Sequence, residues 1–186
     1  MRIIGGNLKG KKIFLPKDKK TRPLRDLVKE SIFNLIEHSK HINLNIDSLN
    51  ILDLFSGSGS FGIECISRGA KKVVFIEEYF EALKILKKNI IHINLEEKCT
   101  IIEKNCFNFF QLQKKKFEKF DLIFIDPPYK EIKINMLIEK IIFRKLLKKD
   151  GILIIHRHKK DKIVITEKIN ILDTRTYGVS KVYFAN

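Results

Sequence analysis

From residue 50 onward, the chain alternates between short continuous apolar runs and longer segments in which apolar residues recur every three or four positions. The first pattern predicts buried strands, and the second predicts amphipathic helices. The predicted strands cover residues 51–55, 72–76, 99–103, 120–125, 152–156, 163–171 and 181–184, and the predicted helices cover 60–68, 79–93, 107–115 and 132–147, with a turn at 149–151. Strands that alternate with helices form a mostly parallel sheet covered on both faces. No helical pattern separates the last two strands, which predicts a C-terminal antiparallel hairpin in a seven-stranded α/β sheet.

A glycine-rich turn follows the first predicted strand. Gly57, Gly59 and Gly62 satisfy the spacing GxGxxG between a strand and a helix, which is the context that this fingerprint requires. Glycines there let backbone N–H groups and a helix N-terminus approach a ligand closely. Glu77, at the end of the second predicted strand, is placed to accept hydrogen bonds from ribose hydroxyls. Together these features predict a site for a nucleoside-containing cofactor.

Asp53 bears on which cofactor this site binds, because NAD and S-adenosylmethionine are both held by this geometry. A buried carboxylate just before the glycine loop repels a pyrophosphate but attracts a ligand that carries an ammonium and a sulfonium group. This favours S-adenosylmethionine. The alternative reading of Asp53 is a structural carboxylate that accepts hydrogen bonds from the N–H groups of the loop.

The fourth predicted strand ends abruptly at Asp126-Pro127-Pro128-Tyr129. The two prolines remove two backbone donors and end the ladder of the sheet. They also fix two φ angles, so the Pro127 carbonyl points in a defined direction beside the Asp126 carboxylate. Taken alone, the stretch is a strand-ending turn. In open α/β sheets, however, ligands bind at the carboxyl ends of the strands, so we expect this tetrapeptide and the glycine loop to line one crevice.

The first 25 residues hold over half of the excess positive charge. The formal net charge is +15, and residues 1–25 contain nine basic side chains against one acid. Residues 2–4 and 12–15 are typical of a hairpin with few apolar contacts, and Thr21-Arg22-Pro23 is typical of the start of a helix that runs to about Glu37. Nucleic acid is the usual partner of so basic a cluster, although a general lysine bias is the alternative. The candidate phosphate contacts are Arg2, Lys9, Lys11, Lys12, Arg22 and Arg25.

The length of 186 residues and the 44% share of hydrophobic residues indicate a single globular body. A polar linker at residues 38–50 separates an N-terminal extension, residues 1–40, from a main domain, residues 41–186. No apolar run is long enough for a membrane span and the N-terminus lacks a secretory signal, so we expect a cytoplasmic protein. Three cysteines without a CxxC pair argue against a disulfide framework or a zinc site, and no metal is expected.

These stretches resemble class I S-adenosylmethionine-dependent methyltransferases that modify exocyclic amino groups of bases. The resemblance rests on Asp53-Leu54-Phe55-Ser56-Gly57-Ser58-Gly59 and on Asp126-Pro127-Pro128-Tyr129. Further N-terminal stretches are similar to the RsmD-type family, which methylates N2 of a guanine in bacterial 16S ribosomal RNA: Arg2-Ile3-Ile4-Gly5-Gly6, Lys9-Gly10-Lys11, Thr21-Arg22-Pro23 and Glu30-Ser31-Ile32-Phe33-Asn34. The resemblance implies a Rossmann-like fold, S-adenosylmethionine as cofactor, and 16S ribosomal RNA as partner, free or within an assembling small subunit. A monomer is the simplest expectation.

The resemblance also implies roles for individual residues. Asp126, Pro127, Pro128 and Tyr129 form the catalytic stretch, in which the Asp126 carboxylate and the Pro127 carbonyl accept the two amine hydrogens while Tyr129 stacks on the unstacked base. The implied cofactor contacts are Asp53, Phe55, Ser56, Gly57, Gly59, Glu77, Asn105 and Cys106. The family usually has an aspartate followed by alanine where this chain has Asn105-Cys106, which leaves an amide oxygen and a backbone N–H for the adenine. Cys106 itself is expected to pack rather than to act as a nucleophile.

His156-Arg157-His158 stands where the family often carries an acid. The expectation for these residues is solvated surface at a strand end, with contact to RNA phosphates as the alternative.

Three other functions are compatible with parts of the sequence. A DNA methyltransferase acting on adenine N6 or cytosine N4 can share the catalytic tetrapeptide, but the N-terminal extension and the lack of a separate DNA-recognition domain count against it. An NAD-dependent oxidoreductase fits the glycine loop and leaves the tetrapeptide unexplained. A cofactor-free RNA-binding module leaves the glycine loop unexplained.

Overall fold

The computed structural model describes residues 1–18, 21, 23–42, 44–109, 118–161 and 169–186. Its centre is a seven-stranded sheet with the order β3-β2-β1-β4-β5-β7-β6. The strands are β1 (Asn50–Leu54), β2 (Lys72–Glu77), β3 (Cys99–Glu103), β4 (Phe120–Ile125), β5 (Leu147–His158), β6 (Ile171–Tyr177) and β7 (Ser180–Ala185). The first five strands run parallel, whereas β7 is antiparallel to both β5 and β6. The predicted Rossmann-like sheet with a C-terminal antiparallel hairpin is therefore confirmed.

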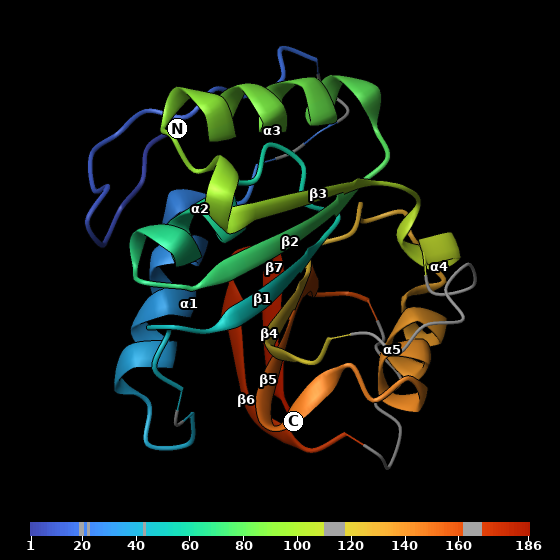
Figure 1. The fold of residues 1–186 in the computed structure, drawn as a ribbon. Helices are drawn as coiled ribbons and strands as arrows, with labels where there is room; N and C mark the ends of the chain where they lie inside the picture. The colour runs from blue at the N-terminus through green and yellow to red at the C-terminus, as the bar shows by residue number, and fades with distance from the viewer. Residues whose placement is uncertain (19–20, 22, 43, 110–117, 162–168) are drawn as a thin grey trace.

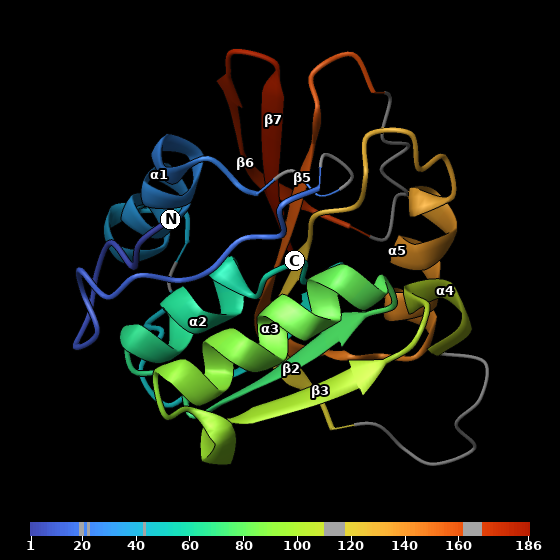
Figure 2. The ribbon, with the colours of Figure 1, turned by 90° about the horizontal axis from the view of Figure 1, so that it is seen from above.

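Helices cover both faces of this sheet (Figure 1). On one side lie α1 (Asp26–His38), α2 (Ser60–Ser67) and α3 (Phe80–His92), and on the other lie α4 (Cys106–Phe109) and α5 (Ile134–Phe143), as Figure 2 shows from a second direction. A short 3-10 helix, η1 (Glu96–Lys98), leads into β3. Each face has its own apolar core. Phe33, Phe61 and Phe124 stack within the first core, whereas Ile123 of β4 packs with Leu137 of α5 in the second.

The alternation of side chains along the strands decides where the polar residues at their ends point. Phe124 of β4 and Ile154 of β5 face the core formed with α1, α2 and α3. Asp53 of β1 is paired in register with Phe124. Because side chains two residues apart in a strand share a face, Asp126 and His156 lie on this same side of the sheet. Three polar groups from three neighbouring strands are thereby directed to one region.

The N-terminal hairpin is reduced to a single antiparallel bridge between Arg2 and Lys12. Its residues Ile3 and Ile13 are only 1% and 4% exposed and belong to the same core as the sheet, so the expectation of few apolar contacts is wrong. The turn of the hairpin contacts the C-terminal end of α2, where the N–H of Asn7 donates to the Ser67 carbonyl at 2.8 Å. The hairpin therefore docks at the end of α2 that is remote from the glycine loop.

Glu64, in the middle of the otherwise apolar helix α2, holds this hairpin in place. Its fully buried carboxylate accepts hydrogen bonds from the N–H groups of Ile4 at 2.9 Å and Gly5 at 2.7 Å. The buried Lys29 ammonium of α1 lies 3.5 Å from the same carboxylate and donates to the Arg2 carbonyl at 3.2 Å. A buried charge is stable only with such partners. Here the partners come from separate segments, so the network joins the hairpin to α1 and α2.

Two expectations for the N-terminal half are corrected. The helix expected to start near Thr21 begins at Asp26, its N-cap is Arg25, and no side chain caps it. Arg25 itself is extended, with a ψ of 141°, and Leu24 beside it is buried in the core. The segment expected to be a polar linker contributes Ile42 and Ile46, which are 2% and 3% exposed, to the core.

Three expectations for the C-terminal half are also corrected. α5 ends at Phe143, and β5 runs from Leu147 through residues 149–151, where a turn was expected. These residues continue the strand because the pairing of β5 with β4 shifts register here. Gly151 lies so close to β4 that a Cβ on it would be 2.9 Å from the carbonyl oxygen of Asp121. Among the described residues the sixth strand, β6, begins only at Ile171, the last residue of the range 163–171 where it was expected, and residues 163–168 lie outside the described residues. Residues 110–115 of the helix that was expected at residues 107–115 also lie outside the described residues.

Candidate active site

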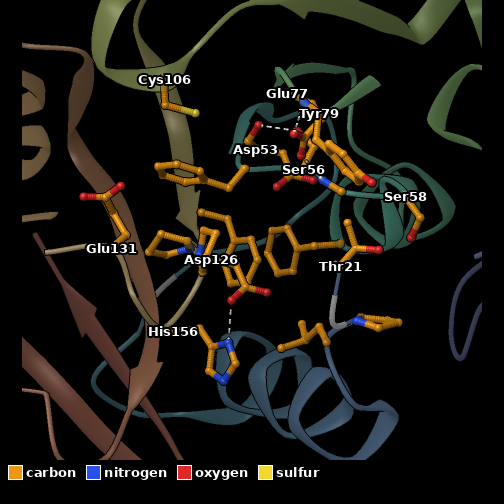
Figure 3. A pocket seen from close by; sticks show the side chains of 18 of the residues that line it. Thr21, Asp53, Ser56, Ser58, Glu77, Tyr79, Cys106, Asp126, Glu131 and His156 are labelled. Carbon is orange, nitrogen blue, oxygen red and sulfur yellow. Dashed lines mark hydrogen bonds and ion pairs between the residues drawn. The ribbon is translucent and has the colours of Figure 1, made fainter. Parts of the chain in front are cut away.

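A cavity of about 790 Å³ opens at the carboxyl ends of β1, β2 and β4 (Figure 3). Its size is within the usual range for a small-molecule site. The glycine loop, the end of β2, the segment after β3 and the tetrapeptide after β4 all contribute to its wall. The expected site residues found in this wall are Asp53, Phe55, Ser56, Gly57, Glu77, Asn105, Cys106, Asp126, Pro127, Pro128, Tyr129 and Arg25. The crevice expected from the sequence is therefore present.

The glycine loop turns sharply out of β1. Phe55 has a φ of 58°, which is strained for a bulky residue, and Gly57 follows with a φ of 56°. Ser56 fixes the turn, because its Oγ donates to the Asp53 carbonyl at 2.6 Å. A Cβ built on Gly57 would meet no atom within 4 Å, so a ligand has room to approach this backbone. Gly59 differs, because a Cβ there would lie 2.4 Å from Leu86, and it packs α2 against α3 without lining the cavity.

Asp53 is the most deeply buried acid of the cavity wall, with 1% of its surface exposed. Burial raises the pKa of its carboxyl well above the usual value, and the charges of Asp126 and Glu77 add to the rise, against the effect of a hydrogen bond from Gly62. That bond runs from the Gly62 N–H to Oδ2 at 3.0 Å. The loop therefore satisfies one oxygen, and the surrounding negative charge creates a place that favours a cation.

Glu77 is held rigidly at the end of β2. Its Oε1 accepts hydrogen bonds from the N–H groups of Glu78 at 2.9 Å and Tyr79 at 2.8 Å, and its Oε2 accepts one from Gly57 at 2.7 Å. Three backbone donors thus fix the carboxylate without side-chain help. This group links the second strand to the glycine loop.

Asn105 begins α4 as its cap. Its Oδ1 accepts a hydrogen bond from the Phe107 N–H at 2.8 Å, and its Nδ2 donates to Glu78 at 2.8 Å. The amide oxygen expected to face an adenine therefore has one lone pair already engaged. Cys106 beside it is 2% exposed, and burial raises the pKa of its thiol, which disfavours the thiolate that a nucleophile requires.

The backbone of the tetrapeptide after β4 is held by one side chain from the next strand. The Arg157 guanidinium donates to the carbonyls of Pro128 at 3.1 Å, Tyr129 at 3.3 Å and Glu131 at 2.8 Å. Within the described part of the chain, the Pro127 carbonyl oxygen receives no hydrogen bond. The loop thus offers one uncommitted carbonyl to the cavity wall while its neighbours are engaged.

His156 and Arg157 were missed as site residues, and the expectation that they are solvated is wrong. They are 6% and 3% exposed, because β5 lies between β4 and β7 and its end remains covered. His156 Nδ1 lies 2.7 Å from Oδ1 of Asp126, as Figure 3 shows. One signal in the sequence was available. His156 and Arg157 directly follow the continuous apolar run at residues 152–155, and a strand at this position of an α/β sheet lies beside the strand that ends at the tetrapeptide.

Asn89 was also missed. It is fully buried in α3, and its Nδ2 donates to the carbonyls of Phe14 at 3.0 Å and Ser58 at 2.9 Å. Its Oδ1 accepts the Phe14 N–H at 2.7 Å. One amide thereby ties the N-terminal segment to the glycine loop, although nothing in the helical pattern of α3 distinguishes it from a solvated Asn.

The candidate phosphate contacts fall into two places. Arg25 is exposed and lines the cavity, whereas the exposed side chains of the hairpin lie outside it. The hairpin residues are Arg2, Lys9, Lys11 and Lys12. Arg22 lies outside the described residues.

Two features are absent from the described residues. Among them, no group of three or more His, Cys, Asp or Glu side chains could hold a metal ion. None of the described helices has both the length and the apolar composition that crossing a bilayer requires.

Comparisons with known proteins relate this arrangement to one family. The family model described as conserved hypothetical protein 95 matches residues 1–186. Ribosomal RNA small subunit methyltransferase D of Buchnera aphidicola subsp. Acyrthosiphon pisum is 35% identical over 163 residues, which are 88% of this chain and 81% of that protein. The protein of the same name from Haemophilus influenzae is 30% identical over 180 residues, covering 96% of this chain and 90% of its own.

Solved structures agree on the fold. A protein from Escherichia coli described as a methyltransferase superposes with a TM-score of 0.84 at 22% identity, over 100% of this chain and 96% of its own. The family model matches the whole chain, and the Buchnera and Haemophilus relatives are at least 30% identical to it. The protein therefore belongs to the RsmD family, the family of ribosomal RNA small subunit methyltransferase D.

Proposed function

We propose that this protein transfers a methyl group from S-adenosylmethionine to the exocyclic N2 amine of a guanine in 16S ribosomal RNA. The observation that carries the proposal is the pair of uncommitted acceptors after β4, Asp126 Oδ2 and the Pro127 carbonyl, in the same cavity as the glycine loop. An amine has two hydrogens to donate. Two acceptors that are fixed side by side at the rigid end of a strand can accept both of these hydrogens.

The cavity suits S-adenosylmethionine by its charge and shape. The buried Asp53 carboxylate, near Asp126 and Glu77, favours a ligand with an ammonium and a sulfonium group. Glu77 would hold the ribose hydroxyls, the open backbone at Gly57 would receive the methionine part, and the Cys106 N–H with the Asn105 oxygen would hold the adenine. When bound, this cofactor supplies a methyl group that is electrophilic because it is attached to a positively charged sulfur.

The residues of the chain prepare the amine for this methyl group. The lone pair of a guanine N2 is delocalised into the ring, so the nitrogen is a poor nucleophile. Asp126 Oδ2 and the Pro127 carbonyl accept its hydrogens and localise the lone pair, and Asp126 Oδ2 is placed to receive the proton that the nitrogen sheds. Tyr129 stacks on the base, its hydroxyl lying 3.3 Å from Ser180 Oγ. Positioning of this kind accounts for most of the expected rate gain.

Ribosomal RNA is supported as the substrate by the relatives, whose names describe ribosomal RNA small subunit methyltransferases. The exposed basic hairpin supports a polyanion in general. NAD is disfavoured because a pyrophosphate would lie near the carboxylates of Asp53, Glu77 and Asp126. A DNA amino-methyltransferase is the remaining candidate, since the two acceptors alone do not distinguish the polymer.

Asp53→Asn tests the charge requirement of the cofactor site. The neutral amide keeps an oxygen for the Gly62 N–H but loses the attraction for a cation, so S-adenosylmethionine binding should weaken about 10- to 100-fold, the value of a charged hydrogen bond of roughly 1.5–3 kcal/mol. Because burial raises the pKa of Asp53, the wild-type affinity should also fall as pH falls through that pKa. Titration calorimetry measures both effects, with the exposed Asp150→Asn as a control. Equal affinity of Asp53→Asn and wild type would contradict the assignment.

Asp126→Ala tests the methyl-transfer step. The variant should still bind S-adenosylmethionine, because Asp53 and Glu77 remain, and should lose about 100- to 1,000-fold in kcat, because a preorganised charged partner of the reacting group is removed. Transfer of labelled methyl groups to small ribosomal subunits, combined with calorimetry of the cofactor, separates the two effects. Undiminished turnover by this variant rules out the mechanism.

The contribution of the hairpin to RNA binding is tested by replacing Lys9, Lys11 and Lys12 with Gln. Each lost phosphate contact should reduce the log–log slope of RNA affinity against salt by about 0.7–0.9. A matched control replaces Lys119, Lys145 and Lys149, exposed lysines near the amino ends of β4 and β5, and so removes the same charge elsewhere. The control should leave the slope nearly unchanged. If both triple variants behave alike, bulk charge rather than the hairpin binds the RNA.

A further inference from the structure

A partly buried contact between β5 and the residue that follows β4 joins His156 to the proposed acceptor of the target amine. His156 Nδ1 lies 2.7 Å from Oδ1 of Asp126, and the side chains are 8% and 19% exposed. β4 and β5 are paired in register up to Ile125 and Ile155, so the next residues of the two strands, Asp126 and His156, are direct neighbours. The contact is thus built into the sheet and does not depend on a loop.

The direction of this hydrogen bond follows from its chemistry. A carboxylate has no proton to give, so the proton lies on His156 Nδ1 and Asp126 Oδ1 accepts it. Among the described residues, the buried Nε2 atom has no hydrogen-bond partner. The proton therefore belongs on the nitrogen that faces Asp126, and Oδ2 of Asp126 is the oxygen left for a substrate.

We propose that His156 is a positioning residue for methyl transfer, which holds the Asp126 carboxylate in the one rotation that presents Oδ2 to the target amine. The inference rests on the proposed function of Asp126 and goes beyond it, because it assigns His156, which also lines the cavity, a role that is exerted through Asp126. Arg157, the next residue of β5, fixes the backbone of the same loop through the carbonyls of Pro128, Tyr129 and Glu131. β5 therefore fixes the side chain of the acceptor with one residue and its loop with the next.

A matched pair of variants tests the proposal. His156→Leu keeps a buried side chain but removes the donor, whereas His156→Asn puts an amide N–H close to the place of Nδ1. We expect His156→Leu to lower kcat roughly 10- to 100-fold, the effect of a small misplacement of a reacting group. The affinity for S-adenosylmethionine should stay within about twofold of wild type, and His156→Asn should recover most of kcat. A pure packing role predicts the reverse order, because Leu suits an apolar wall better than Asn does.

Wild-type kcat in His156→Leu, or equal loss of kcat in both variants, would overturn the proposal. A second measurement does not depend on activity or on the folding of variants. The ¹⁵N NMR signals of the His156 ring in the wild-type protein should show a protonated Nδ1, and a bare Nδ1 would also overturn the proposal. If wild type methylates no small-subunit RNA, the proposed function fails, while the ring signals still decide whether His156 donates to Asp126.

Discussion

The parallel pairing of β1 with β4 is the constraint on which the site depends. Leu54 and Ile125 are register partners at the ends of these strands, so the glycine loop and the tetrapeptide at residues 126–129 leave the sheet side by side. β2 and β3 extend the sheet on one side of this pair and β5 extends it on the other. The order of strands reverses between β1 and β4, which is where open α/β sheets bind their ligands. The two stretches proposed to bind the cofactor and the base thus lie side by side directly at the ends of paired strands, and no long loop is needed to bring them together.

The distribution of charge complements this geometry. The chain carries a net charge of +15, yet its cavity is lined by the carboxylates of Asp53, Glu77 and Asp126. The three carboxylates therefore make the inner wall of the cavity favourable to a cation, whereas the surface as a whole attracts polyanions. The basic side chain of Arg25 also lines this cavity. The hairpin that carries several of the surface charges is anchored by Glu64 and Lys29, two buried charges that compensate each other.

Much of the fold and part of the site could be predicted because they depend on local patterns. Continuous apolar runs located β1 to β4, and the glycine spacing located the loop. Both patterns depend only on residues that are close together in the sequence. The pattern after β4 was less informative, because Lys149, Asp150 and Gly151 are residues typical of a turn although they form part of β5. Contacts between residues that are far apart in sequence were the main feature that the sequence could not predict. His156 and Arg157 resemble a solvated strand end, and only the place of β5 between β4 and β7 shows that they are buried. Glu64 and Asn89 belong to the same class, since their partners lie far away in sequence.

The central proposal is that this protein methylates an exocyclic guanine amine in small-subunit RNA, and that the two acceptors after β4 hold this amine during the transfer. The most direct measurement is to incubate the protein and labelled S-adenosylmethionine with unmodified small ribosomal subunits, free 16S RNA and DNA, and then to digest each polymer to nucleosides. The account predicts labelled N2-methylguanosine from the RNA, with DNA unlabelled. Label in methylated adenine or cytosine of DNA, or in any nucleoside of the RNA other than N2-methylguanosine, would contradict it.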